Sequence, residues 1–154
     1  MRIMKPPVPV DVSPSDRVVF LAGSIEMGAA EDWQARIAAD LGDLDAVALN
    51  PRRDEWDASW RQSIDEPRFR EQVEWELAGL ERADVIAMWF APETKAPITL
   101  LELGLHARGG RVIVGCPHGF WRRGNLEVVC ARYDVPLVAA WEPFVAAVRS
   151  RVAP

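Results

Sequence analysis

Two features of this sequence predict an α/β fold with helices on both faces of a parallel sheet. From residue 17 onward, short apolar runs rich in β-branched residues alternate with longer segments of helical period. The apolar runs are continuous, which is typical of strands that are buried on both faces. Five such runs predict a flavodoxin-like doubly wound sheet with the strand order 2-1-3-4-5.

The bulk properties limit the classes of function. The 154 residues are enough for one domain, and a net charge of −5 argues against binding to a nucleic-acid backbone. No apolar run has the length of a membrane span, and the N-terminus lacks the core of a signal peptide. The cysteines and histidines have no metal-ligand spacing, so we expect no metal and two reduced thiols in a cytoplasmic protein (Cys116, Cys130, His106 and His118).

The elements follow one another along the chain. Residues 1–16 hold four prolines and predict an extended arm, and residues 17–154 form the single domain. The apolar runs predict strands at 17–22, 46–49, 84–90, 111–115 and 135–138. The helical segments predict helices at about 29–41, 66–82, 125–132 and 142–151, and one that begins at Pro97 and ends at the pair Gly109-Gly110.

The helix that begins at Pro97 carries the main clue to function. Ile98, Leu101 and Leu105 have the spacing of a stripe that faces the core, and Glu102 falls on the same stripe. Burial of a carboxylate on an apolar face is costly unless another group pairs with it or the chemistry uses it. We therefore expect Glu102 to be catalytic.

A second glutamate has a similar position on the helix at 66–82. Glu76 falls on an apolar stripe made by Phe69, Val73, Leu77 and Leu80. Two convergent carboxylates are what glycosyl transfer requires, one as the nucleophile and the other to handle protons or contact the substrate. The alternative is that each glutamate pairs with a buried arginine, for instance Arg52, Arg53 or Arg70.

Ligands of doubly wound sheets lie at the carboxyl ends of the strands. This rule selects Gly23 and Ser24, the segment 50–60, the segment 89–94 and the first turns of the helices that follow, whereas Asp84 lies at the opposite end of its strand and is expected to be structural. The turn at Gly23 and Ser24 would offer backbone N–H groups to an anion or a sugar hydroxyl. Glu26 would repel a phosphate there, and its alternative role is to pair with the dipole of a helix N-terminus.

Aromatic and charged residues at the same edge suit a flat heterocycle. The Trp89-Phe90 pair would stack on a nucleobase, with core packing as the alternative. The loop residues Arg52, Arg53, Asp54 and Trp56 would close over the base, with a solvated charged loop as the alternative.

Three segments resemble the nucleoside 2-deoxyribosyltransferase family. FLAGSIEMG (20–28) resembles its first strand and glycine turn, and APITLLELG (96–104) resembles its nucleophile helix, in which Glu102 stands at the place of the attacking glutamate. Glu76 matches the acid that contacts the nucleobase. Gly124-Asn125-Leu126 is similar to a segment that reaches the sugar in the site of a neighbouring subunit.

The resemblance implies transfer of a 2-deoxyribosyl group between free nucleobases through a covalent sugar–Glu102 intermediate, with no cofactor. It also implies a homo-oligomer with shared sites, in which Ser24 and a neighbour's Asn125 position the sugar. The alternatives are an N-glycoside hydrolase of nucleosides or their 5′-monophosphates and a non-catalytic nucleoside- or nucleotide-binding module.

The chain departs from the family pattern at several positions. Ala96 and Pro97 stand where a second base-contacting aspartate is found, and Val19 stands in place of a tyrosine. Relatives that act on nucleoside 5′-monophosphates have an arginine where this chain has Glu26, so unphosphorylated nucleosides are the expected substrates.

Overall fold

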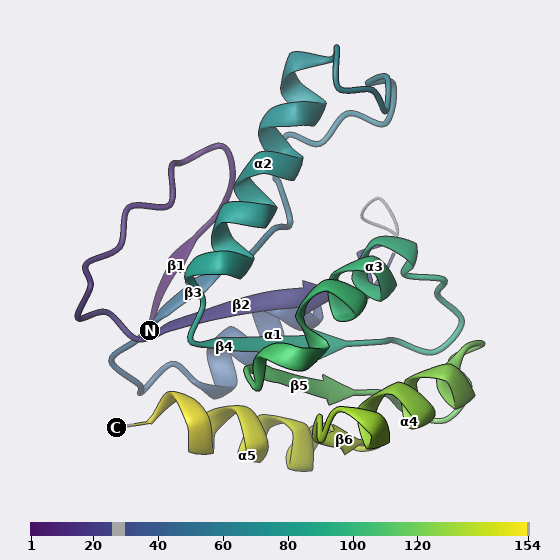
Figure 1. The fold of residues 1–154 in the computed structure, drawn as a ribbon. Helices are drawn as coiled ribbons and strands as arrows, with labels where there is room; N and C mark the ends of the chain where they lie inside the picture. Colours follow the sequence, from purple (N-terminus) through teal and green to yellow (C-terminus); the bar gives the residue numbers. More distant parts are fainter. Residues whose placement is uncertain (26–29, 154) are drawn as a thin grey trace.

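The computed structural model describes residues 1–25 and 30–153 of the chain, which form one parallel sheet with helices on both faces. The strand order is β1-β3-β2-β4-β5-β6 (Figure 1). The prediction of five strands is wrong, because a further strand from the N-terminal arm pairs with β3 at the edge of the sheet. The strands are β1 (Arg2–Met4), β2 (Val18–Gly23), β3 (Val47–Leu49), β4 (Val85–Trp89), β5 (Val112–Gly115) and β6 (Leu137–Val138).

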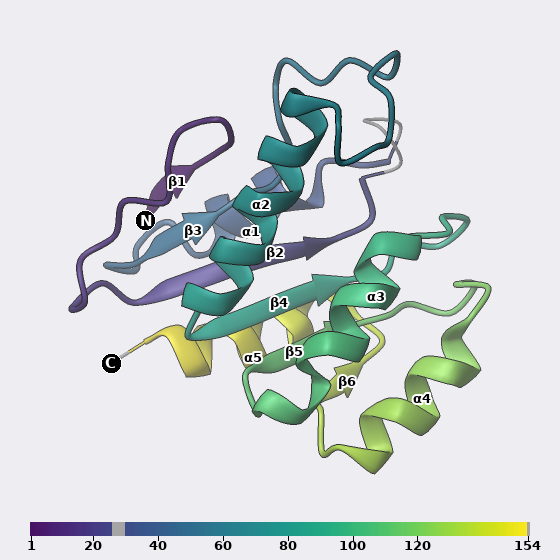
Figure 2. The ribbon, with the colours of Figure 1, turned by 45° about the horizontal axis from the view of Figure 1, so that its top comes forward.

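Helices cover both faces of the sheet (Figures 1 and 2). The sheet separates the core into two clusters, one on each face. On one face, the helices α2, α3 and α4 pack over alternate strand residues such as Phe20 and Met88. On the other face, α1 and α5 cover the residues between them, such as Leu21 and Ala87. The helices are α1 (Trp33–Asp40), α2 (Pro67–Arg82), α3 (Pro97–His106), α4 (Arg123–Arg132) and α5 (Trp141–Val152), and a 3-10 turn, η2 (Ala107–Gly109), follows α3.

The ends of the helices show which local signals were informative. Proline occupies the first turn of both α2 and α3, where its missing N–H has no intrahelical partner. Gly110 adopts the left-handed φ of 68° that stops the segment after α3. Helix α1 begins at Trp33, and its N-cap Asp32 accepts a hydrogen bond from the Ala35 N–H. The predicted start at Ala29 lies outside the described residues.

The apolar stripe on α3 that was predicted to face the core faces solvent instead. Ile98, Leu101 and Leu105 are exposed, at 58%, 61% and 59% of their surface, and the buried side of the helix carries Thr99, Glu102 and Leu103. Helical spacing is the same for either side of a helix, and here the mostly apolar sequence of α3 leaves the spacing ambiguous.

The predicted stripe on α2 is only partly correct. Leu80 is buried and Leu77 is exposed, while Phe69 and Val73 are half-buried. The residues that α2 buries are Gln72, Trp75, Gly79 and Leu80. A methyl group at position 79 would lie 2.8 Å from the ring of Phe20, so glycine lets this helix approach the sheet closely.

Side chains of α2 fasten the N-terminal arm to the rest of the fold. Trp75 Nε1 donates a hydrogen bond to the carbonyl oxygen of Val8, at 2.7 Å, and Arg82 donates to the carbonyl oxygen of Ser13. The structural role expected for Asp84 is confirmed, because its carboxylate accepts a hydrogen bond from Val18 N–H at 2.8 Å. Among the described helices, none is both long and apolar enough to cross a membrane.

Candidate active site

Two carboxylates, on neighbouring helices of the same sheet face, form the centre of the candidate site. Glu102 lies on the inner side of α3 and is 7% exposed, and Glu76 is half-buried on α2. Both helices lie over the same face of the sheet (Figure 2). They contribute to the same core cluster, through Leu103 of α3 and Leu80 of α2. The structure therefore brings together the two acids that the sequence singled out.

The environment of these carboxylates favours their protonated forms. Burial raises the pKa of Glu102 to about 8, and the negative charge of Glu76 adds to this shift. Burial also raises the pKa of Glu76, although a hydrogen bond from Gln72 acts in the opposite direction. Because the two groups interact, they titrate as a pair, and near neutral pH the pair retains a proton.

The arginines that were the alternative partners of these acids are bound elsewhere. Arg52 pairs with Asp32 at 3.4 Å, Arg53 with Glu71 at 2.8 Å and Arg70 with Glu74 at 3.5 Å. No cation contributes to the raised pKa of Glu102. Within the described part of the chain, arginine pairing therefore does not explain why Glu102 is buried.

Gln72 is a polar residue of this site that the sequence analysis missed. It lies one helical turn before Glu76 and is 5% exposed. Its Nε2 atom donates to Glu76 Oε1 and to the carbonyl oxygen of Pro51, both at 2.9 Å. The available signal was its spacing, because residues i and i+4 of a helix lie on the same side.

The hydroxyl of Ser24 connects the end of β2 to the loop that leads into α3. Ser24 Oγ accepts a hydrogen bond from Ala91 N–H at 3.1 Å and lies 2.6 Å from Thr94 Oγ1. Thr94 donates its own proton to the carbonyl oxygen of Ala91, so Ser24 donates to Thr94. Ser24 is fully buried, and its role in binding the sugar stays a prediction.

The turn at Gly23 and Ser24 does not offer both of its backbone N–H groups to a ligand, because Ser24 N–H donates to the carbonyl oxygen of Trp89 at 3.0 Å. A Cβ at position 23 would lie 2.5 Å from that same oxygen and 2.5 Å from the ring of Trp33. Gly23 is therefore needed for the close approach of β2, β4 and α1. The expected effect of Glu26 on a phosphate lies outside the described residues.

Trp89 packs in the core, which was the alternative to stacking on a nucleobase, and its contact with a base stays a prediction. Its ring lies on the face covered by α1 and α5, 4.9 Å from the ring of Trp141 and 5.1 Å from that of Phe144. On the opposite face, Phe90 packs 5.0 Å from Phe120. Successive strand residues point to opposite faces, so the two rings join the core on opposite sides of the sheet.

Ion pairs and hydrogen bonds connect the loop after β3 to neighbouring segments of the fold. Arg52 contacts the segment before α1, where it donates to the carbonyl oxygens of Ala30 and Glu31. Asp54 accepts from Lys5 at 2.6 Å. The ring of Trp56 lies 5.2 Å from that of Trp60, and its Nε1 is buried with no hydrogen-bond partner in the described part of the chain. Contacts of these residues with a base stay predictions.

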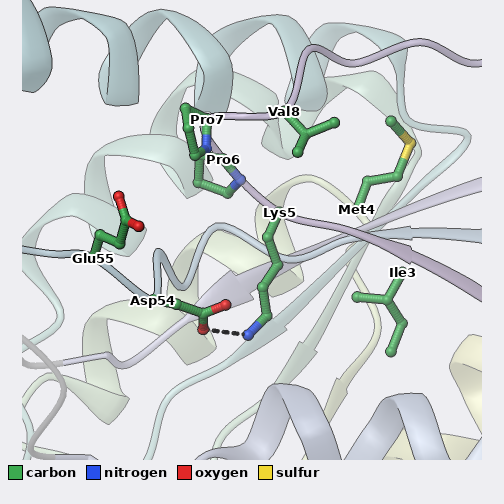
Figure 3. Close-up of a pocket in the computed structure, with 8 residues that line it drawn as sticks. All are labelled: Ile3, Met4, Lys5, Pro6, Pro7, Val8, Asp54 and Glu55. Atoms are coloured by element: carbon green, nitrogen blue, oxygen red, sulfur yellow. Dashed lines mark hydrogen bonds and ion pairs between the residues drawn. The ribbon is translucent and has the colours of Figure 1, made fainter.

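Asp54 also lines a pocket of about 440 Å³ at the carboxyl ends of β1 and β3 (Figure 3). Lys5 and Asp54, which form an ion pair, both line this pocket. The other lining residues are Glu55 and residues of the N-terminal arm. Neither Glu76 nor Glu102 lines this pocket. It belongs to the arm and the loop after β3, at the edge of the sheet.

Two further predictions concern groups outside this centre. Asn125 is exposed on α4, where it faces solvent in a single copy of the chain. In the described residues, no cluster of three or more histidine, cysteine or acidic side chains could hold a metal ion. Both cysteines are buried with free thiols.

Comparison with known proteins shows the fold and the family of this chain. A crystal structure of a conserved protein from Enterococcus faecalis V583 superimposes with a TM-score of 0.62, at 13% sequence identity, over 89% of this chain and 99% of that chain. A likeness at this identity shows a shared fold. None of the curated proteins matches the sequence. Residues 16–120, which include both Glu76 and Glu102, match the family described as nucleoside 2-deoxyribosyltransferase like. The chain therefore belongs to the nucleoside 2-deoxyribosyltransferase-like family.

Proposed function

We propose that this protein transfers a 2-deoxyribosyl group between nucleobases, with Glu102 as the nucleophile. The observation that carries this proposal is the pair of carboxylates on α2 and α3, of which Glu102 is buried and has no cationic partner within the described residues. A carboxylate in such a place destabilises the fold, so its presence is best explained by a catalytic use.

In the first half of the reaction, a carboxylate oxygen of Glu102 forms a bond to C1′ of a 2′-deoxynucleoside. The bond between C1′ and the base breaks, its electron pair stays on the base nitrogen, and Glu76 gives a proton to the departing base. The transition state resembles an oxocarbenium ion, which the negative charge of Glu102 stabilises.

In the second half, a different base attacks C1′ from the side that the first base has left. The ester bond to Glu102 breaks with its electron pair on the carboxylate, and the proton of the incoming base returns to Glu76. Two inversions at C1′ restore the β-configuration. No metal ion or organic cofactor takes part in this scheme.

The shared proton of the pair has to lie on Glu76 when the base binds. A ring nitrogen with a lone pair would repel an ionised Glu76, whereas a protonated Glu76 donates a hydrogen bond to it. Binding of the base therefore draws the proton to Glu76 and leaves Glu102 ionised. The closeness of the two carboxyl groups, seen in their electrostatic interaction, supports this coupling.

The remaining predicted roles extend this proposal. Asp54, Arg52 and Trp56 would hold the base, and Asn125 of a neighbouring copy would position the sugar. Such sharing requires a homo-oligomer. The exposed apolar side of α3, beside the candidate site, supports association of copies through this region.

The direct test replaces the nucleophile. Glu102→Ala should abolish base exchange, a loss of at least about a thousandfold, because no covalent intermediate can form. The assay supplies deoxycytidine or deoxyinosine together with adenine and measures deoxyadenosine by chromatography. The matched control is Glu142→Ala, which removes an exposed glutamate from α5 on the opposite face.

The products of the same assay distinguish the alternatives. Exchange that persists in folded Glu102→Ala would contradict the assignment of the nucleophile. Free deoxyribose without new deoxyadenosine from the wild-type protein would identify an N-glycoside hydrolase. Thermal stabilisation by nucleosides without any product would identify a binding module.

A further inference from the structure

The amide group of Gln72 has a donor side that is fully used and an acceptor side that is not. Both Nε2 bonds, to the carbonyl oxygen of Pro51 and to Glu76 Oε1, are 2.9 Å long. An amide nitrogen has two hydrogens, so these bonds use its donor capacity completely. Gln72 Oε1 is buried and has no hydrogen-bond partner among residues 1–25 and 30–153.

The orientation of this amide is fixed by its neighbours. A backbone carbonyl oxygen can only accept, so the atom of Gln72 that faces Pro51 has to be the nitrogen. A rotation that exchanged the two atoms would place two oxygens against each other. Gln72 Oε1 therefore points away from the carbonyl oxygen of Pro51, while Nε2 of the same amide contacts the Glu76 carboxyl.

An unpartnered acceptor at this depth is unfavourable in the free protein. A buried polar atom without a hydrogen bond destabilises the folded protein, and a ligand N–H removes this cost when it binds. Among the described residues, this acceptor belongs to the side chain that donates a hydrogen bond to Glu76, where the proposed function places the nucleobase.

We propose that Gln72 Oε1 accepts a hydrogen bond from the exocyclic amino group of the nucleobase, so that the site selects adenine and cytosine over bases with a carbonyl in that position. This inference rests on the proposed function, because it places the base at Glu76. It adds Gln72 as a residue that determines specificity, and it names the class of base.

The chemistry of the leaving base determines which edge meets the two side chains. In adenine, the ring nitrogen N7, which has a lone pair, stands next to the amino group on C6, and in cytosine N3 stands next to the amino group on C4. Protonated Glu76 can donate to that nitrogen while the amino group donates to Gln72 Oε1. Hypoxanthine and guanine instead present a carbonyl oxygen beside N7, which would face Gln72 Oε1 without a proton between them. Thymine and uracil carry a hydrogen on N3 and cannot take the proton there.

The first experiment uses the wild-type protein and varies only the substituent on the purine. The donors are deoxyadenosine, the 2′-deoxyriboside of purine with hydrogen at C6, and deoxyinosine. We expect kcat/KM for base exchange to fall about tenfold to a hundredfold when the amino group is replaced by hydrogen, and further when it is replaced by oxygen. Equal values for the three donors would overturn the inference.

The second experiment removes the acceptor. Gln72→Leu should bring the ratio of kcat/KM for deoxyadenosine and deoxyinosine close to one, whatever its effect on the absolute rate, since a purely structural role would lower both together. Gln62→Leu, in the exposed loop before α2, is the control and should keep the wild-type ratio. An unchanged ratio in folded Gln72→Leu would contradict the assignment.

A binding measurement separates this inference from the proposed function. Titration calorimetry on Glu102→Ala measures the binding of free adenine and of free hypoxanthine without turnover. Adenine should bind at least about tenfold more tightly than hypoxanthine. If the wild-type protein exchanges no base but binds adenine with this preference, and Gln72→Leu removes the preference, the inference stands and the transferase assignment fails. If exchange occurs and adenine has no advantage, the assignment stands and the inference fails.

Discussion

Glu102 is an acid whose burial opposes the stability of the folded chain. In the unfolded chain its pKa is near the ordinary value of 4.5, and burial raises the pKa to about 8 in the folded protein. Between these values the unfolded chain loses the proton while the folded protein keeps it. The protonated carboxyl therefore favours the folded state fully below about pH 4.5. This stabilisation is lost as the pH rises toward 8.

This linkage gives a prediction for the isosteric amide. Glu102→Gln should have nearly the stability of the wild-type protein at pH 4, and by pH 8 it should be more stable by an amount on the order of a few kcal/mol, because the amide does not ionise. Chemical denaturation of both proteins from pH 4 to 8 measures the difference. Parallel stability curves would show that Glu102 titrates as an exposed acid.

At the scale of the element, the sequence identified both helices that carry the acids, but it did not identify their buried sides. Composition and the prolines predicted the positions of α2 and α3 closely. The stripe of Ile98, Leu101 and Leu105 failed because apolar residues lie on both sides of α3, so only tertiary packing decides which side is buried. The sequence likewise left open whether Trp89 packs in the core, since it does not show which helix covers each face.

The loop into α3 depends on a hydrogen bond that a single substitution removes. Ser24→Ala leaves the Ala91 N–H without its acceptor and should cost about 1–3 kcal/mol. For a domain of this size, the melting temperature should fall by roughly 2–10 °C, as measured by calorimetry. An unchanged melting temperature with a raised KM for the nucleoside would instead assign the hydroxyl of Ser24 to the sugar.

At the scale of the molecule, the alternation of strands and helices was sufficient to predict the parallel sheet and its helices on both faces, while the added edge strand was missed. Prolines near residues 6–9 indicated an extended arm, and no periodicity marks the three residues of β1 as a strand. Its pairing with β3 is a long-range contact that local sequence does not encode. The interaction of Gln72 with Pro51 was hidden in the same way, because its partner is 21 positions away.

The proposed homo-oligomer is tested at the exposed side of α3. Leu101→Glu places a charge between the exposed side chains of Ile98 and Leu105. It should shift the protein from oligomer to monomer, as measured by light scattering after gel filtration. Ile64→Glu, which changes an exposed apolar residue in the loop before α2, is the control and should leave the mass unchanged. A monomeric wild-type protein would contradict the sharing of sites between copies.

The two outermost strands of the sheet limit how copies of this chain can associate. β1 has three residues and β6 has two, so each edge offers few free backbone groups to another molecule. Short edges of this kind discourage the continuation of one sheet into another, which is a common route to fibrils. Neighbouring copies are therefore left to recognise each other through side chains on the helices.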